Sequence, residues 1–230
     1  LLHASLPWAD ADEWKRVFDE YGNEVAAVVV VASYADMQRG REFYPLLREL
    51  TERHRAVLVF DEIVTGFRVA RAGVQEYFGV TPDLAVFAKG MANGMPISAY
   101  VGRSELIESC RALSISTTFG GETLSLAAVR AVQRFYDEHD VVSRIWESAE
   151  AIWSGARRIF EDAGVPISMR GFPVCPTFDI GDELSSEEFF AAAYRNGLLL
   201  YQVPYTTYSH GPRDVEETLD RLERAVRELV

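Results

Sequence analysis

Two unbroken runs of apolar, mostly β-branched residues place the strongest constraint on the fold of this chain. They span residues 25–31 and 56–60, and neither contains a polar side chain. Such a run suits a strand that is buried on both faces, as in a parallel sheet. Amphipathic helix patterns precede them at residues 10–21 and 43–50. Strands that alternate with helices predict an α/β domain with a largely parallel sheet.

Two shorter apolar segments, residues 84–87 and 97–101, predict further strands of the same domain. A long helix is then expected over residues 122–139. Its apolar side chains are expected to face the core, and they are Leu126, Val129, Ala131, Val132 and Phe135. We therefore assign residues 1–140 to one domain that ends with this connecting helix.

The pattern changes after residue 140 and predicts a second, smaller α+β domain over residues 141–230. The expected elements are a helix at 141–163, a strand at 174–180, a helix at 186–196, a strand at 198–202 and a helix at 212–229. Gly164, Val165 and Pro166 end the first of these helices, because glycine and proline do not continue a helix.

The charge balance excludes several classes of partner. The chain has 23 basic and 35 acidic side chains, a net charge of −12, which disfavours binding to nucleic acid or to anionic lipid. Cys110 and Cys175 lie far apart without metal-binding spacing, so we expect neither a disulfide nor a metal site, and a reducing cytoplasm. The longest apolar run, residues 25–32, is too short for a membrane span of about 20 residues.

An acidic pair, Asp61 and Glu62, follows the second apolar run. Open α/β sheets bind ligands at the carboxyl ends of their strands, so this pair is a candidate site. One alternative is a solvated strand end. Another is the magnesium-binding carboxylate of a nucleotide triphosphatase, but that site needs a glycine-rich Lys-Ser/Thr loop, which this chain does not contain.

Lys89 closes the apolar segment at residues 84–87, just before a glycine-rich turn. A lysine at this place is expected to be partly desolvated, which makes its neutral amine available as a nucleophile toward a carbonyl. The alternative is an ordinary lysine whose ammonium reaches solvent from a strand end. This residue is therefore a second candidate for chemistry.

A third candidate is the hydroxyl-rich and glycine-rich segment at residues 116–123, which runs into the long predicted helix. Backbone N–H groups and short hydroxyl side chains at a helix start can bind an anion. The alternative is that the hydroxyls only cap the helix. Arg68 has two interpretations as well, either contact with a substrate carboxylate or a structural ion pair.

Taken together, these segments resemble the class III aminotransferases, and most closely the glutamate-1-semialdehyde aminomutase-like branch. The resemblance is carried by Phe-Asp-Glu-Ile-Val-Thr-Gly-Phe-Arg at residues 60–68, by Thr-Pro-Asp-Leu at 81–84 with Lys-Gly at 89–90 and Gly-Met-Pro-Ile at 94–97, and by Thr-Thr-Phe-Gly-Gly-Glu-Thr-Leu-Ser at 117–125. The order and spacing match over residues 25–126. Thr-Tyr-Ser-His-Gly at residues 207–211, before an acidic helix, is also typical.

The resemblance implies the fold type I architecture of pyridoxal-phosphate (PLP) enzymes. Residues 1–140 would be the C-terminal part of the large cofactor-binding domain, and residues 141–230 the small C-terminal domain. By analogy Asp61 would bind the pyridine nitrogen, Ile63 would pack on the ring and Lys89 would hold the cofactor as a Schiff base. Thr118, with Thr117 beside it, would bind the cofactor phosphate across a dimer interface.

The resemblance also implies an activity and partners. We expect transfer of an amino group from a donor amine to a keto or aldehyde substrate. An aminomutase, which moves an amine within one substrate, is the alternative, although Thr-Phe-Gly-Gly-Glu-Thr replaces the aminomutases' usual Gly-Thr-Leu-Ser-Gly-Asn-Pro. Because family members are considerably longer, we expect an N-terminal complement that carries the main phosphate loop, in a homodimer or hetero-oligomer. A catalytically silent subunit for assembly or binding is a further hypothesis.

Overall fold

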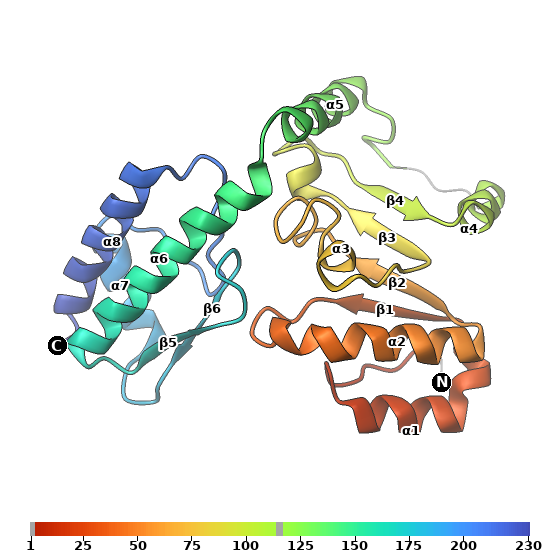
Figure 1. Cartoon of the computed structure of the whole chain (residues 1–230), viewed down its shortest axis with the longest axis horizontal. Helices are drawn as coiled ribbons and strands as arrows, with labels where there is room; N and C mark the ends of the chain where they lie inside the picture. Colours follow the sequence, from red (N-terminus) through yellow and green to blue (C-terminus); the bar gives the residue numbers. More distant parts are fainter. Residues whose placement is uncertain (1–2, 114–116) are drawn as a thin grey trace. The chain divides into compact units, whose positions relative to one another are not determined.

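The computed structural model describes residues 3–113 and 117–230. It divides into two units (Figure 1). The first contains the chain up to residue 32 together with residues 39–139, and the second contains residues 33–38 together with residues 140–230. The candidate residues Asp61, Lys89, Thr117 and Thr118 all belong to the first unit.

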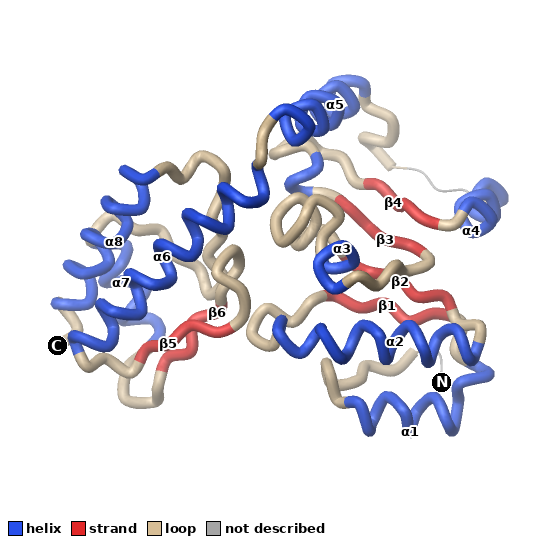
Figure 2. The backbone as a smooth tube through the Cα atoms, viewed as in Figure 1, coloured by secondary structure: helices blue, strands red, loops and turns tan. Residues whose placement is uncertain are grey.

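The first unit is built on a four-stranded sheet. Its strands are β1 (Ala27–Val31), β2 (Val57–Asp61), β3 (Leu84–Phe87) and β4 (Ala99–Gly102), in that order across the sheet. The first three run parallel, and β4 is antiparallel to β3, as the arrows in Figure 1 show. Figure 2 shows the strands of this sheet in red, beside blue helices. The predicted largely parallel sheet is therefore confirmed, with an antiparallel strand at one edge.

The helices of this unit are α1 (Ala11–Tyr21), α2 (Gly40–His54), α3 (Val74–Phe78), α4 (Ser104–Ser109) and α5 (Thr123–Glu138). The periodicity predicts α1, α2 and α5, but not the short helices α3 and α4. Helix α2 packs on β2 and α4 on β4, whereas α1 and α3 pack on α2. Asp10 caps α1 by accepting the Glu13 N–H at 3.1 Å, as expected of an N-cap carboxylate. The buried face of α2 lies on the sheet, where the Tyr44 and Phe60 rings are 4.9 Å apart.

The expected burial of β1 on both faces is wrong. Val28 and Val30 are buried, but Val29 and Val31 are 71% and 53% exposed, so β1 is covered on one face and not on both. Tyr44 of α2 and Phe78 of α3 also contact each other, with ring centroids 5.2 Å apart, which places both helices on the same side of the sheet. The other face, called here the open face, carries Val29 and Val31.

Helix α5 shows the same effect. The expected inward residues Leu126, Ala131 and Phe135 are exposed, whereas Val129 and Val132 are half-buried. The helix formed where the period predicts it. Its apolar stripe is nevertheless largely uncovered in this chain.

The second unit has an α+β composition. It contains α6 (Val141–Ala163), β5 (Ile167–Arg170), β6 (Thr177–Ile180), α7 (Ser186–Arg195) and α8 (Pro212–Arg227). Strands β5 and β6 pair antiparallel. Its hydrophobic core contains Phe160, Ile167, Phe189, Leu222 and Val226.

The sequence located the helices of this unit better than its strands. Gly164 ends α6 with a left-handed φ of +66°, as predicted from the glycine. The strand expected at residues 174–180 starts only at Thr177, and its partner β5 was not predicted. The strand expected at 198–202 is wrong, because this segment is irregular and contributes a single backbone bond to β6, from Phe178 N–H to Gln202 O at 3.3 Å.

Within the ranges that the structure describes, no helix has the length and apolarity needed to cross a membrane.

Candidate functional site

Asp61 lies at the carboxyl end of the parallel strands, on the open face of the sheet. It is the last residue of β2, and it pairs in register with Val31 of β1 and Val86 of β3, which in turn pairs with Tyr100 of β4. Residues paired across neighbouring strands share one face of a sheet. Because Val31 and Tyr100 in this row are more than half exposed, the half-buried Asp61 carboxylate lies on an accessible surface.

The orientation of the Asp61 carboxylate is fixed locally. Its Oδ1 accepts the backbone N–H of Ile63 at 2.9 Å. This bond spans two residues, a pattern that aspartate forms readily in turns. Ile63 is itself half-buried. The chain therefore turns immediately after β2 and keeps Asp61 and Ile63 together.

Glu62 is buried, whereas Asp61, its neighbour in the sequence, is half-buried on the open face. The Glu62 side chain is 1% exposed. It accepts the hydroxyl of Thr65 and the backbone N–H groups of Val74 and Gln75, each of the latter at 2.9 Å. Burial raises the pKa of Glu62, and these hydrogen bonds oppose that shift. The sequence motif treats Asp61 and Glu62 as one acidic pair, and the signal that separates them is strand alternation, which sends neighbouring side chains to opposite faces of a sheet.

Lys89 lies at the same edge of the sheet as Asp61. It follows β3, whose Val86 pairs with Asp61, and it opens a 3-10 turn over Lys89–Met91. Its φ of +38° is unusual for a residue other than glycine. Such backbone conformations concentrate at functional sites.

The expected desolvation of Lys89 is wrong for this chain. Its side chain is exposed, whereas the following residues Met91 and Ala92 are buried. The reason is that β3 ends at Phe87 and the following turn carries Lys89 out of the packed layer. The amine is therefore open to solvent.

Thr117 and Thr118 lie in an exposed turn that leads to α5, and Ser116 lies outside the described residues. The interpretation that these hydroxyls cap the helix is wrong. Glu122 is the N-cap, and it accepts the N–H groups of Leu124 and Ser125 at 2.6 and 2.7 Å. Helix α5 also packs against the turn that contains Lys89, so the turn with Thr118 precedes a helix that reaches the site.

Arg68 belongs to a group of side chains that joins the loop after β2 to α5. Arg68 is half-buried. Burial raises the pKa of Tyr136, and the positive charge of Arg68 opposes that shift in part. The Tyr136 hydroxyl donates to the Phe67 carbonyl at 2.6 Å. Arg71 forms an ion pair with Asp137 at 2.6 Å. This arrangement gives Arg68 a structural neighbourhood, and its contact with a substrate carboxylate stays a prediction.

Groups of His, Cys, Asp and Glu that could hold a metal ion were not found in residues 3–113 and 117–230. The functional groups at the site are a carboxylate, a primary amine and hydroxyls. A carboxylate can pair with a cationic ring nitrogen, an amine can react with an aldehyde and hydroxyls can donate to a phosphate. Asp61, Lys89 and Thr118 supply these three kinds of group.

Comparison with protein families matches residues 6–215 to the family described as aminotransferase class-III. This chain belongs to the class-III aminotransferase family. The resemblance inferred from the motifs is thereby confirmed. Among individual relatives, this family member is 32% identical over 223 residues to 2'-deamino-2'-hydroxyneamine transaminase of Streptomyces kanamyceticus, a match that covers 94% of this chain and 55% of that protein.

Other relatives of this class-III chain include aminomutases. It is 28% identical over 247 residues to glutamate-1-semialdehyde 2,1-aminomutase of Aquifex aeolicus strain VF5. The match covers 97% of this chain and 58% of that enzyme. The solved structure of the FumI protein of Sphingopyxis sp. MTA144, in its PLP internal aldimine form, superposes with a TM-score of 0.88 at 24% identity, covering 98% of this chain and 57% of that one. The fold is thus that of part of a fold type I enzyme. The chain spans a little over half the length of the curated relatives it matches.

Proposed function

We propose that this chain is part of a PLP-dependent aminotransferase that transfers an amino group from a donor amine to a keto or aldehyde substrate. The observation that carries the proposal is the position of Asp61 and Lys89. Asp61 ends β2 and Lys89 follows the neighbouring parallel strand β3, at the carboxyl edge of the sheet, in a chain of the class-III aminotransferase family. Open α/β sheets bind their ligands at this edge.

Asp61 and Ile63 would hold the cofactor ring. A carboxylate beside a pyridine nitrogen favours its protonated form. The bond from Ile63 N–H to Asp61 Oδ1 keeps that carboxylate in one orientation without a rearrangement on binding. When bound, PLP supplies an electron sink that makes the Cα proton of an amine substrate acidic.

Lys89 would supply the amine to which the cofactor is attached as a Schiff base. Once displaced by a substrate amine, the same Nζ is the base and acid that moves a proton at the substrate Cα. Thr118 and Thr117 would donate hydrogen bonds to the cofactor phosphate. Their exposed turn suits a phosphate on the partner subunit of a dimer, since both hydroxyls are accessible from outside this chain.

An N-terminal complement, either a further segment or a separate chain, would complete the site. Parallel sheets are normally covered on both faces, whereas Val29, Val31 and Tyr100 are exposed on the open face beside Asp61. Burying one valine side chain stabilises a fold by about 1.5 kcal/mol or more. The matched relatives are correspondingly longer, since the chain covers 55% and 58% of two of them.

An aminomutase is the second candidate, because glutamate-1-semialdehyde 2,1-aminomutases are among the relatives. Transamination has the support of the relative at 32% identity, which is a transaminase by name. Product analysis separates the two activities. An aminomutase converts a single substrate without an added amine or carbonyl partner, whereas a transaminase needs both.

The lysine content of the chain gives a direct test. Lys15 and Lys89 are its only lysines, and Lys15 is exposed on α1. We would add PLP to the chain, alone and with its N-terminal complement, and then reduce with borohydride and map the labelled peptide by mass spectrometry. Before reduction, Lys89 should give a visible absorbance band; borohydride should remove that band and leave the label on Lys89.

Matched variants sharpen this test. Lys89→Ala should abolish the band, Asp61→Ala should weaken cofactor binding, and Lys15→Ala should leave both unchanged. Absence of a Lys89-dependent band when the complement is present would reject the enzyme and support the silent assembly subunit.

A further inference from the structure

A buried carboxylate lies directly beside the proposed ligand of the cofactor ring. Glu62 follows Asp61, and its side chain points away from the open face because successive residues alternate along a strand. Its backbone N–H donates to Val86 O at 2.9 Å, which extends the pairing of β2 with β3 by one residue. Any movement of Glu62 therefore displaces the end of β2 that carries Asp61.

The surroundings of the Glu62 carboxylate consist of hydrogen-bond donors. They are the Thr65 hydroxyl, the backbone N–H groups of Val74 and Gln75, and the Gln75 side-chain amide at 3.4 Å. An ionised carboxylate accepts such bonds at both oxygens, whereas an amide accepts at one only. The site is therefore built for a glutamate and not for a glutamine.

Gly73 shows how closely the chain approaches this carboxylate. A Cβ at position 73 would collide with Glu62 Oε2, and the φ of Gly73 is +79°. Glycine is the residue that adopts this conformation without strain. Glu62 begins the segment of residues 62–75, and its carboxylate accepts backbone N–H groups at the far end of that segment. These hydrogen bonds close the segment into a loop.

Stability alone does not account for the carboxylate. Burial raises the pKa of Glu62, against the opposing hydrogen bonds from Thr65, Gln75 and Val74. A raised pKa means that ionising Glu62 is less favourable in the folded chain than in the unfolded one. Burial of this carboxylate therefore costs free energy that its hydrogen bonds offset only in part.

The closed loop connects the end of β2 to α5. Near its start the Ile63 N–H donates to Asp61. In its middle, Phe67 has a φ of +59° and its carbonyl accepts the Tyr136 hydroxyl of α5 at 2.6 Å. Arg71, in the same loop, binds the Gln133 side chain of α5 at 2.6 Å. This one loop therefore contacts both Asp61, the proposed ligand of the cofactor ring, and α5, which follows the turn with the proposed phosphate ligand Thr118.

We propose that Glu62 is a positioning residue for the cofactor site, because its carboxylate closes residues 62–75 into a fixed loop that holds Asp61 and α5 relative to each other. Asp61 is the proposed ligand of the ring nitrogen, and α5 follows the turn with the proposed phosphate ligand Thr118. The inference therefore rests on the proposed function.

Glu62→Gln is the test variant, because it keeps the shape and places amide hydrogens among donors. Thr65→Val is a milder second variant that removes one donor from the carboxylate. Asp83→Asn is the matched control. Asp83 is also a buried carboxylate with backbone and side-chain donors, but it precedes β3 at the end opposite Lys89.

Hydrogen exchange of the chain without added cofactor gives the first measurement. Glu62→Gln should accelerate exchange about tenfold or more at the Ile63, Val74 and Gln75 amides and in the part of α5 around Tyr136. Thr65→Val should also accelerate exchange at these amides, but by a smaller factor. Asp83→Asn should leave their exchange rates unchanged. Unchanged exchange at Ile63 and in α5 would overturn the proposal.

Cofactor binding gives the second measurement, on the chain assembled with its N-terminal complement. Glu62→Gln should weaken PLP binding about tenfold or more, since small misplacements of binding groups are costly, and it should shift the unfolding midpoint less than Asp83→Asn does. Asp83→Asn should lower that midpoint and leave PLP binding intact. Equal PLP affinity in Glu62→Gln and the unaltered chain would refute the positioning role.

The two measurements separate the hypotheses. If the unaltered assembly forms no Lys89-dependent band, the proposed function fails. The hydrogen-exchange result then still decides whether Glu62 holds the loop to Asp61 and α5.

Discussion

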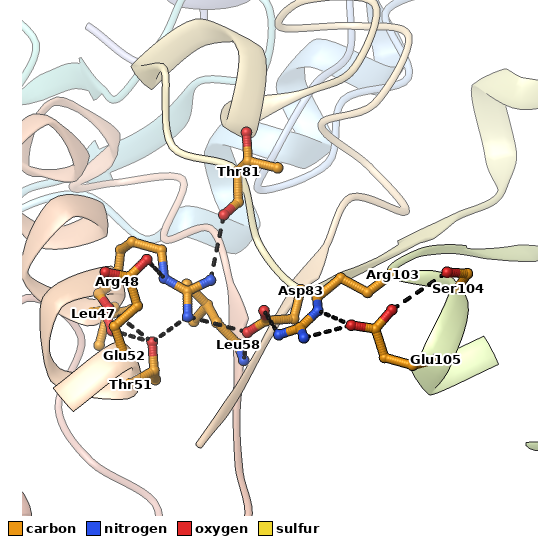
Figure 3. A network of polar contacts seen from close by, with 10 residues as sticks. All are labelled: Leu47, Arg48, Thr51, Glu52, Leu58, Thr81, Asp83, Arg103, Ser104 and Glu105. Atoms are coloured by element: carbon orange, nitrogen blue, oxygen red, sulfur yellow. Dashed lines mark hydrogen bonds and ion pairs between the residues drawn. The ribbon is translucent and has the colours of Figure 1, made fainter. Parts of the chain in front are cut away.

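Replacing Asp83 is expected to destabilise the first unit without touching the candidate site. Asp83 precedes β3 and is 9% exposed at its side chain. Figure 3 shows that it joins three elements, because it accepts the Leu58 N–H of β2 at 2.8 Å, Arg48 of α2 at 3.1 Å and Arg103 after β4 at 3.2 Å. Removal of this carboxylate therefore loosens α2, β2 and β4 together.

The magnitude follows from the two buried contacts. The N–H of the fully buried Leu58 loses this acceptor, which costs about 1–3 kcal/mol. The bond to Arg48, whose side chain is 20% exposed, adds about 1.5 kcal/mol as a charge-assisted hydrogen bond. Arg103 is too exposed to add to the sum. Asp83→Ala should therefore cost about 2.5–4.5 kcal/mol, or roughly 10 °C in midpoint, and Asp83→Asn about half of that free energy.

The effect should depend on pH. Burial raises the pKa of Asp83, but the Leu58 N–H and the Arg48 and Arg103 guanidinium groups outweigh it and hold the pKa below the ordinary value of 3.8. A carboxyl with a lowered pKa stabilises the fold above its unfolded pKa, and this contribution is lost as the pH falls through the folded pKa. The stability difference between the unaltered chain and Asp83→Asn should thus be constant near neutral pH and shrink below about pH 4.

Urea unfolding followed by circular dichroism, from pH 7 to pH 3, measures both quantities. Glu105→Gln is a suitable control, because Glu105 pairs with Arg103 at the surface and exposed ion pairs contribute little. A loss below about 0.5 kcal/mol for Asp83→Ala, or a difference that grows toward low pH, would refute this account of the network.

Three further substitutions test individual contacts. Gly73→Ala should cost about 2–3 kcal/mol, because its Cβ meets the Glu62 carboxylate at a φ of +79°; an unchanged urea midpoint would contradict this. Gly171→Ala, at a φ of +89° and against the Tyr34 carbonyl, should release residues 33–38 from the second unit and expose them to limited proteolysis. Tyr136→Phe removes the hydrogen bond to the loop after β2 and should cost about 1 kcal/mol in thermal unfolding, with faster exchange in that loop.

The sequence by itself determined the features that depend on neighbouring residues. The periods of α1, α6 and α8 located these helices, and Asp10 and Gly164 located two of their ends, because caps act through adjacent backbone groups. The order of strands and helices determined the parallel sheet. The motifs around Asp61, Lys89 and Thr118 determined the family, and with it the candidate site.

The tertiary structure alone decided which of these residues are covered. An apolar run in the sequence does not indicate which segment packs on it. Strand β1 has one exposed face, and the apolar stripe of α5 is largely uncovered. A strand forms only where a partner strand pairs with it, which is why the apolar segment at 198–202 is irregular, whereas the more polar β5 forms by pairing with β6. Burial also divided the acidic pair, since Asp61 lies on the open face and Glu62 inside, and it left Lys89 in solvent. Burial is a property of segments that meet in space, and local sequence carries too little information to specify it.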